Sequence, residues 1–118
     1  MVDTILPSIP RLLVLRSLAD QSRHGYAIAR WVENASNGVL TLKEGTLYPL
    51  LHLMEREGLL ESAWVKTEGA RPAKWYRLTP KGLDRLRTDY QEWAERAPKI
   101  DQILAHRGGM PDAYGRLV

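Results

Sequence analysis

Residues 44–58 read EGTLYPLLHLMEREG, and this stretch decides the fold. Its apolar side chains recur at i, i+3, i+4 and i+7, which places them on one face of a helix. These residues are Leu47, Leu50, Leu51 and Met54. Gly58 stands where a helix-ending glycine is expected. The pattern predicts an amphipathic helix from about Glu44 to Glu57, with one face turned toward a core.

Two further helices and a short strand are predicted before this stretch. Apolar residues at helical spacing predict a first helix that ends near Asp20, with Ser8 as its cap. A second helix opens at Ser22 or His24. The short alternating run Val39–Leu42, which follows the second helix, is consistent with a small strand.

A hairpin and a long helix are predicted after it. Leu59–Lys66 and Ala73–Leu78 are rich in residues that favour strands, and the polar segment Thr67–Pro72 joins them. This loop is too long for a two-residue turn, so it should project. Thr79 and Pro80 then supply a capping hydroxyl and a proline at the first helical position.

The joint order of these elements predicts an α+β fold, mainly α. It is that of a winged helix-turn-helix with a long C-terminal helix. We expect a DNA-binding domain over residues 1–82, a dimerisation helix over residues 83–107 and a flexible tail over residues 108–118.

Composition excludes several classes of protein. The 118 residues fit one domain, and the absence of cysteine excludes disulfides, cysteine nucleophiles and thiolate metal sites. His24, His52 and His106 lie far apart, so no metal site is predicted. The sequence shows no suggestive order of Ser, His and Asp, and no glycine-rich phosphate loop follows a strand. We therefore expect neither an enzyme nor a cofactor. Without a membrane-length apolar run or a signal pattern, we expect a cytoplasmic protein.

The positive charge is concentrated in the first part of the chain. Residues 1–82 carry 11 Lys and Arg against 8 Asp and Glu, whereas residues 83–118 carry 6 of each. The excess indicates a polyanionic partner for the first part. Taken alone, it is explained equally well by ordinary solvated surface charge.

In a helix-turn-helix the later helix lies in the major groove, so the outward face of residues 44–57 supplies candidate contacts. The free N–H groups of its first turn suit a phosphate, and the arginine of the loop suits the minor groove or the backbone. The candidate DNA-binding residues are Lys43, Gly45, Thr46, Tyr48, Pro49, His52, Arg56, Arg71 and Lys74. Pro49 loses no internal hydrogen bond only in the first turn, so the regular helix could begin as late as Thr46.

Four blocks, HGYAI (24–28), EGTLYPLL (44–51), EGLLES (57–62) and KWYRLTPKG (74–82), resemble the PadR family of bacterial regulators. The resemblance implies a homodimer that binds palindromic operators and usually represses, with Tyr48 near DNA.

Two positions depart from the family pattern. Lys43 replaces a frequent Ser or Thr cap, so the cap comes from Thr41 or is absent. Leu53 replaces a frequent basic residue and could touch a thymine methyl group.

The C-terminal segment carries an apolar seam with heptad spacing. Its members, the candidate dimer interface, are Leu83, Leu86, Tyr90, Trp93, Ala97, Ile100 and Leu104. A winged helix needs only part of such a seam, and the remainder predicts a homodimer; the alternative is that the whole stripe packs within one subunit. Pro98 predicts a kink or two helical pieces.

Tyr90 and Trp93 are also candidate ligand-binding residues. The family resemblance implies flat aromatic effectors at the dimer interface of some members, on which Trp93 could stack. The alternative is that both side chains simply belong to the core. Two other functions stay open at this point: a winged helix used for protein contacts, which Leu53 favours, and a small-molecule sensor with weak affinity for DNA.

Overall fold

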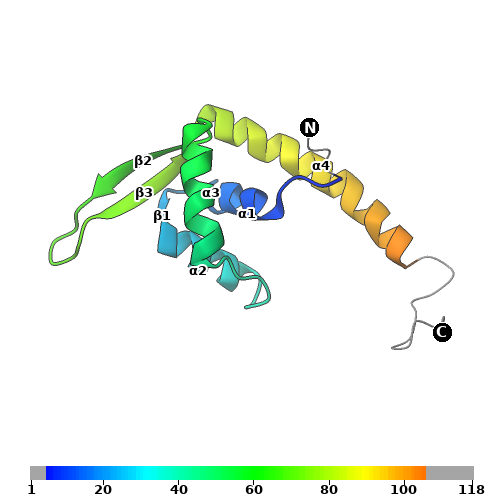
Figure 1. Ribbon diagram of the computed structural model, residues 1–118, viewed down its shortest axis with the longest axis horizontal. Helices are drawn as coiled ribbons and strands as arrows, with labels where there is room; N and C mark the ends of the chain where they lie inside the picture. The colour runs from blue at the N-terminus through cyan, green and yellow to red at the C-terminus, as the bar shows by residue number, and fades with distance from the viewer. Residues whose placement is uncertain (1–4, 106–118) are drawn as a thin grey trace.

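The computed structural model describes residues 5–105, in which helices surround one end of a small sheet (Figure 1). The elements in chain order are α1 (Ile9–Ser17), β1 (Arg23–His24), α2 (Gly25–Ala35), α3 (Glu44–Arg56), β2 (Leu60–Val65), β3 (Ala73–Leu78) and α4 (Pro80–Leu104). The antiparallel sheet has the order β1-β3-β2. This architecture confirms the predicted α+β, mainly helical winged helix-turn-helix. The predicted tail, residues 108–118, lies outside the described residues.

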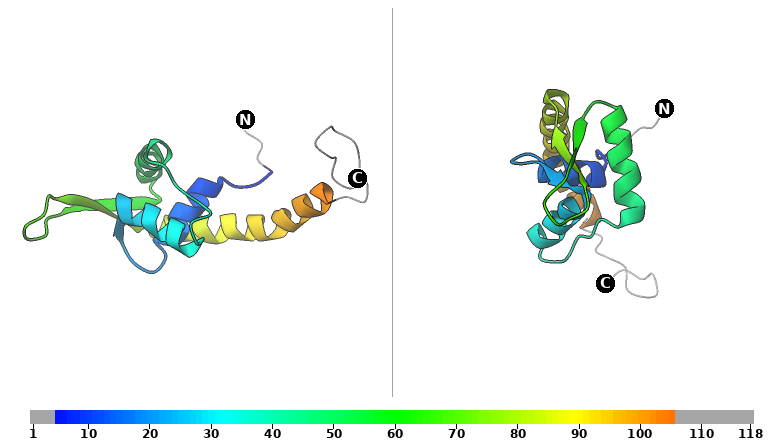
Figure 2. Two further views of the ribbon diagram at one scale, coloured as in Figure 1. Left: turned by 90° about the horizontal axis from the view of Figure 1, so that it is seen from below. Right: turned by 90° about the vertical axis from the view of Figure 1, so that its left-hand side faces the viewer.

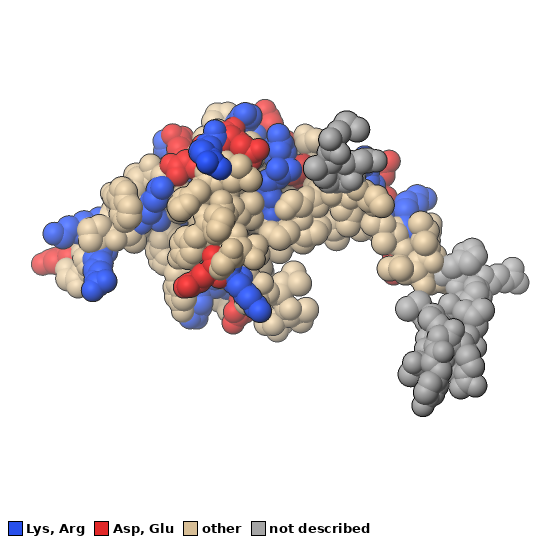
Figure 3. Space-filling view, in the orientation of Figure 1, with Lys and Arg blue, Asp and Glu red and all other residues tan. Residues whose placement is uncertain are grey.

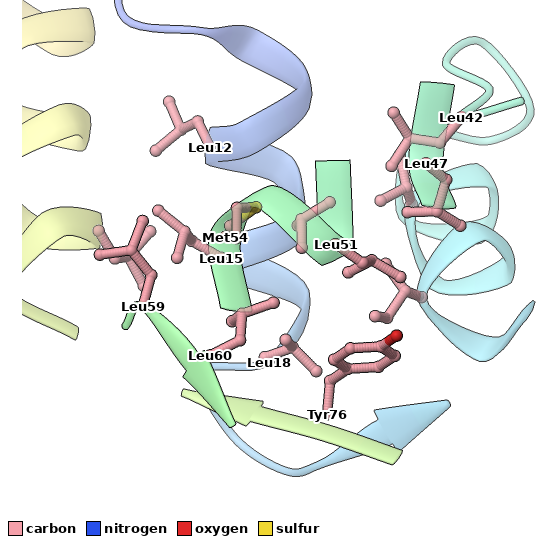
Figure 4. Close-up of a cluster of buried hydrophobic side chains, with 14 residues drawn as sticks. Leu12, Leu15, Leu18, Leu42, Leu47, Leu51, Met54, Leu59, Leu60 and Tyr76 are labelled. Atoms are coloured by element: carbon pink, nitrogen blue, oxygen red, sulfur yellow. The ribbon is translucent and has the colours of Figure 1, made fainter. Parts of the chain in front are cut away.

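The core lies between α1, α2, α3 and the near end of the sheet (Figure 4). The predicted stripe of α3 is confirmed: Leu47, Leu51 and Met54 are buried, and Leu50 packs against them. Each fully buried leucine contributes about 1.5–3 kcal/mol. Because this face is fixed against the core, the opposite face of α3 must point outward.

Three helices begin at the predicted caps. Ser8 accepts a hydrogen bond from the backbone N–H of the third residue after it, and Thr79 does the same at the start of α4. For α2 the structure selects His24, whose Nδ1 accepts from Ala27 N at 3.1 Å. The opening of α4, with Pro80 at its first position, is as predicted.

The third strand is not where the sequence predicted it. The segment Val39–Leu42 forms no strand, and the expectation was wrong. Instead, Arg23 pairs with Tyr76 and His24 with Trp75, so that β1 occupies the edge of β3. Two residues are too few to give a periodic signal. In Val39–Leu42 only Leu42 is buried in the core, whereas Val39 and Leu40 are exposed, and the segment joins α2 to α3 without pairing to the sheet.

Helix α4 is continuous through Pro98, so of the two outcomes expected there, a kink or two helical pieces, the second is not found. Proline removes the hydrogen bond to the carbonyl of Ala94, but both residues are exposed, where water can satisfy that carbonyl. The left view of Figure 2 shows the helix curving in its C-terminal part. The first half of α4 packs on α1 through Leu86, and the second half extends away from the body (Figure 1).

Candidate nucleic-acid interface

The outward face of α3 is open to solvent over its whole length. Its exposed residues are Thr46, Pro49, Leu53 and Arg56, flanked by Tyr48 and His52. The sequence predicted this orientation correctly. Figure 3 shows charged groups near both ends of this helix and largely uncharged surface between them. Such a face can present methyl, ring and hydroxyl groups to base edges, with cations near the phosphates.

The start of α3 agrees with the expectation. The helix begins at Glu44, as the apolar spacing predicted; the later start at Thr46 that Pro49 allowed is not found, and Pro49 stands in the helix interior, on the exposed side. Lys43 occupies the N-cap position without a side-chain cap hydrogen bond, as the sequence allowed. The free N–H groups at the start of a helix suit an anion, although the carboxylate of Glu44 lies in the same turn.

Two glycines border this face. Gly45 is exposed, and a methyl group added to it would meet no atom within 4 Å. Gly25, the first residue of α2, is buried directly beneath the ring of Tyr48. The contact leaves 38% of Tyr48 exposed, so the ring leans on α2 while part of it remains available to a partner.

The hairpin β2–β3 extends from the body as the wing, and its loop carries Arg71 in an exposed position. Gly69 has a φ of 76°, and the N–H of Ala70 donates to the carbonyl of Thr67, which closes the loop. Figure 3 shows basic groups with an acidic one at the far end of the hairpin. The loop therefore presents Arg71 to solvent at the end of the wing that is farthest from the core.

Lys74 differs from the other candidate residues because its ammonium group is already paired. Its Nζ lies 3.0 Å from Oε1 of Glu55 on α3, and 5.5 Å from the ring centroid of Tyr76. The other carboxylate oxygen of Glu55 accepts a hydrogen bond from Ser62 on β2.

These contacts also shift the pKa values of Glu55 and Lys74. The hydrogen bonds from Ser62 and then Lys74 lower the pKa of Glu55, and the bond to Glu55 raises the pKa of Lys74. Glu55 could not be predicted from the sequence, because a pair that spans 19 residues gives no local signal.

A second feature is an apolar groove of about 560 Å³ between α1 and α4. Tyr90 and Trp93 of α4 line it with their ring centroids 6.4 Å apart, Arg16 lines it from α1, and Leu40 reaches it from the segment that joins α2 to α3. Leu83 and Leu86 of the predicted seam pack on the chain's own core. The seam is therefore divided: its beginning completes the domain, while its later apolar residues include large exposed side chains.

Residues 5–105 contain neither a cluster of metal-ligating side chains nor a candidate membrane-spanning helix. No three His, Asp or Glu side chains gather there in a way that could hold a metal ion. Within the same residues, no helix combines the length and the apolar character of a membrane span. His106 lies outside the described residues.

Three comparisons with known proteins agree with this architecture. The family model described as "Transcriptional regulator PadR-like family" matches residues 14–88. The transcriptional regulator Rv3488 of Mycobacterium tuberculosis is 34% identical over 99 residues, which cover 84% of this chain and 89% of that protein.

Two solved structures are similar throughout the fold. A PadR family transcription regulator of Clostridium difficile has a TM-score of 0.70 and 30% identity, covering 82% of this chain and 99% of its own. A PadR family transcriptional regulator of Eggerthella lenta has a TM-score of 0.69 and 32% identity, covering 80% of each chain.

Proposed function

The chain belongs to the PadR-like family of transcriptional regulators, and on that premise we propose that it is a sequence-specific repressor that binds a palindromic operator as a homodimer. The family consists of transcriptional regulators and not of enzymes, as the sequence analysis expected. The observation that carries the proposal is the exposed, largely uncharged outer face of α3, which stands beside a wing with a basic tip.

The proposed division of labour follows the chemistry of the exposed residues. Thr46, Tyr48 and Leu53 would reach base edges with a hydroxyl group, a phenol and a methyl group, while Pro49 and His52 complete that surface. The proposed backbone contacts are the exposed Lys43, Gly45, Arg56 and Arg71, since cations and an unobstructed N–H suit phosphates. Lys74 is not among them, because Glu55 already binds its ammonium.

The partner proposed for the apolar seam is a second copy of this chain. Tyr90 is 58% exposed and Leu104 61% exposed, and α4 extends beyond the body that it caps. Within residues 5–105, the domain therefore leaves the later part of the seam uncovered. The α4 of one copy, with Trp93, Ala97 and Ile100 on its seam, would pack against the α4 of the other, so that the groove lies at the edge of the interface. Two α3 helices about 34 Å apart would then enter successive major grooves.

The groove between α1 and α4 suits a flat aromatic effector. Its lining is mainly apolar, and the stacked rings of Tyr90 and Trp93 offer a surface for a further ring. Titration of the protein with aromatic compounds should quench the fluorescence of Trp93. Quenching that persists unchanged in Trp93→Leu would refute this site.

The first experiment is binding of the purified protein to DNA from upstream of its own gene, with an unrelated fragment as control, across a series of salt concentrations. Selective binding that weakens steeply with salt is expected, because phosphate contacts release counterions. Affinity that is indifferent to salt would instead favour a winged helix that contacts proteins, for which the exposed Leu53 would be the centre of an apolar surface.

A further inference from the structure

The wing is attached to the end of α3 by a group of contacts at its base. Gly58, with a φ of 78°, ends α3, and its carbonyl accepts from Thr79 Oγ1 at 2.6 Å. The backbone N–H of Thr79 donates to the carbonyl of Leu59 at 3.1 Å. Figure 1 shows that the hairpin leaves the end of α3 near the point where α4 begins. These contacts hold the base of the wing, where Leu60 and Tyr76 are also buried in the core and β1 pairs with β3.

Glu55 provides a second attachment, farther along the hairpin. It is the next-to-last residue of α3 and binds both strands of the hairpin at once. Oε2 accepts from Ser62 on β2, and Oε1 accepts from Lys74 on β3 at 3.0 Å. A second point of attachment restrains the angle between the wing and α3. The side chains of Glu55 and Lys74 are half-buried there, so water competes less for their hydrogen bond.

The same contact neutralises Lys74. This lysine stands on the side of the wing that faces α3, in the space between the two elements that are proposed to meet DNA. A free ammonium there would attract any phosphate, whatever the sequence. Bound to Glu55 and lying over the ring of Tyr76, it adds little affinity that is independent of sequence.

We propose that Glu55 is a specificity-determining residue that fixes the angle between the wing and α3 and withholds Lys74 from the DNA backbone. This inference rests on the proposed function, because it concerns how the chain discriminates among DNA sequences. Glu55 is a positioning residue in this account: it acts through Lys74 and Ser62 and touches no base itself.

The test compares two glutamates of the same chain. Glu55→Ala removes the attachment, whereas Glu61→Ala removes an equal charge from the exposed Glu61–Arg77 pair, which links β2 to β3 without reaching α3. Glu55→Gln is the conservative variant, since its amide can still accept from Lys74 and donate to Ser62. The probes are a duplex that the wild-type chain selects from random-sequence DNA and a scrambled duplex of equal composition.

For Glu55→Ala we expect the ratio of selected to scrambled affinity to fall about ten-fold, comparable with the loss of one base contact. The salt dependence should steepen by about one unit in log K against log salt, because Lys74 is released to a phosphate. For Glu55→Gln, both the affinity ratio and the salt dependence should lie between the values of Glu55→Ala and the wild type. For Glu61→Ala, both should match the wild type. A role confined to stability would lower both affinities by one factor and leave the salt dependence unchanged.

Lys74→Met keeps the test decisive if Glu55→Ala does not fold. If Lys74 anchors Glu55, its loss should lower the ratio of selected to scrambled affinity and leave the salt dependence unchanged. If Lys74 binds a phosphate instead, the slope of log K against log salt should become shallower by about one. Equal behaviour of the Glu55 and Glu61 variants would overturn this inference alone. A wild-type chain that selects no sequence would refute the proposed function, and this inference would fall with it.

Discussion

The ring of Tyr48 lies on the backbone of Gly25, so closely that a methyl group added to Gly25 would stand 2.7 Å from Cε1 of Tyr48. The first residue of α2 thus sets how far the tyrosine of α3 can lean inward. A glycine is required there for space, since any Cβ would displace the ring.

Gly25→Ala should therefore impair DNA recognition more than it impairs folding. Tyr48 is partly exposed, so its ring can swing outward at little cost, while alanine favours the helix by up to about 1 kcal/mol. We expect a melting temperature within a few degrees of the wild type and affinity for the selected duplex about ten-fold lower. A large loss of stability with unchanged DNA affinity would contradict this reading of the contact.

Gly45→Ala tests the proposed approach of the DNA backbone. The added methyl group meets no atom of the chain within 4 Å, so the free energy of unfolding should stay constant or rise slightly. Binding to every duplex should weaken if a phosphate occupies that space. Electrophoretic mobility shifts beside thermal melts will check this, and unchanged DNA binding would show that Gly45 lies outside the contact.

Tyr48→Phe and Arg71→Met should separate base contacts from phosphate contacts. Loss of the phenol hydroxyl should reduce the preference for the selected duplex, by about 1–3 kcal/mol if the phenol contacts a base. Loss of the arginine at the wing tip should weaken selected and scrambled duplexes alike and make the salt dependence shallower by about one. Fluorescence anisotropy across a salt series measures both quantities. Equal effects of the two variants would contradict the proposed division.

Trp93→Glu should convert the proposed dimer into a monomer. The substitution places a charge within the seam of α4, where packing against a second copy would remove it from water. Gln91→Glu adds the same charge to an exposed position of the same helix that lies outside the seam and serves as the control. Sedimentation equilibrium reads the molecular mass, and a wild-type chain that already sediments as a monomer would refute the proposed interface.

Acidification should weaken the attachment between α3 and the wing. The pKa of Glu55 is lowered in the folded chain by Ser62 and Lys74, so its carboxylate stabilises the fold at neutral pH. That contribution is lost as the pH falls through the folded pKa. The difference in free energy of unfolding between wild type and Glu55→Gln should be largest near pH 7 and should shrink toward about pH 3. Urea titrations at several pH values measure this difference. A difference that grows as the pH falls would contradict a lowered pKa of Glu55 in the folded chain.

The sequence by itself determined which faces the helices turn inward and where most elements begin. Burial of Leu47, Leu51 and Met54 follows from their spacing, and the caps at Ser8 and Thr79 follow from local hydrogen bonding. These features are local, so a few neighbouring residues suffice to predict them.

Only the tertiary structure decided what depends on residues distant in the chain. The strand Arg23–His24 exists because β3 offers it an edge, and the groove at Trp93 is shared between α1 and α4. The contacts of Tyr48 with Gly25 and of Lys74 with Glu55 join segments that only the folded core brings together. Periodicity reveals which way a side chain points, whereas its partner is set by the packing of whole elements.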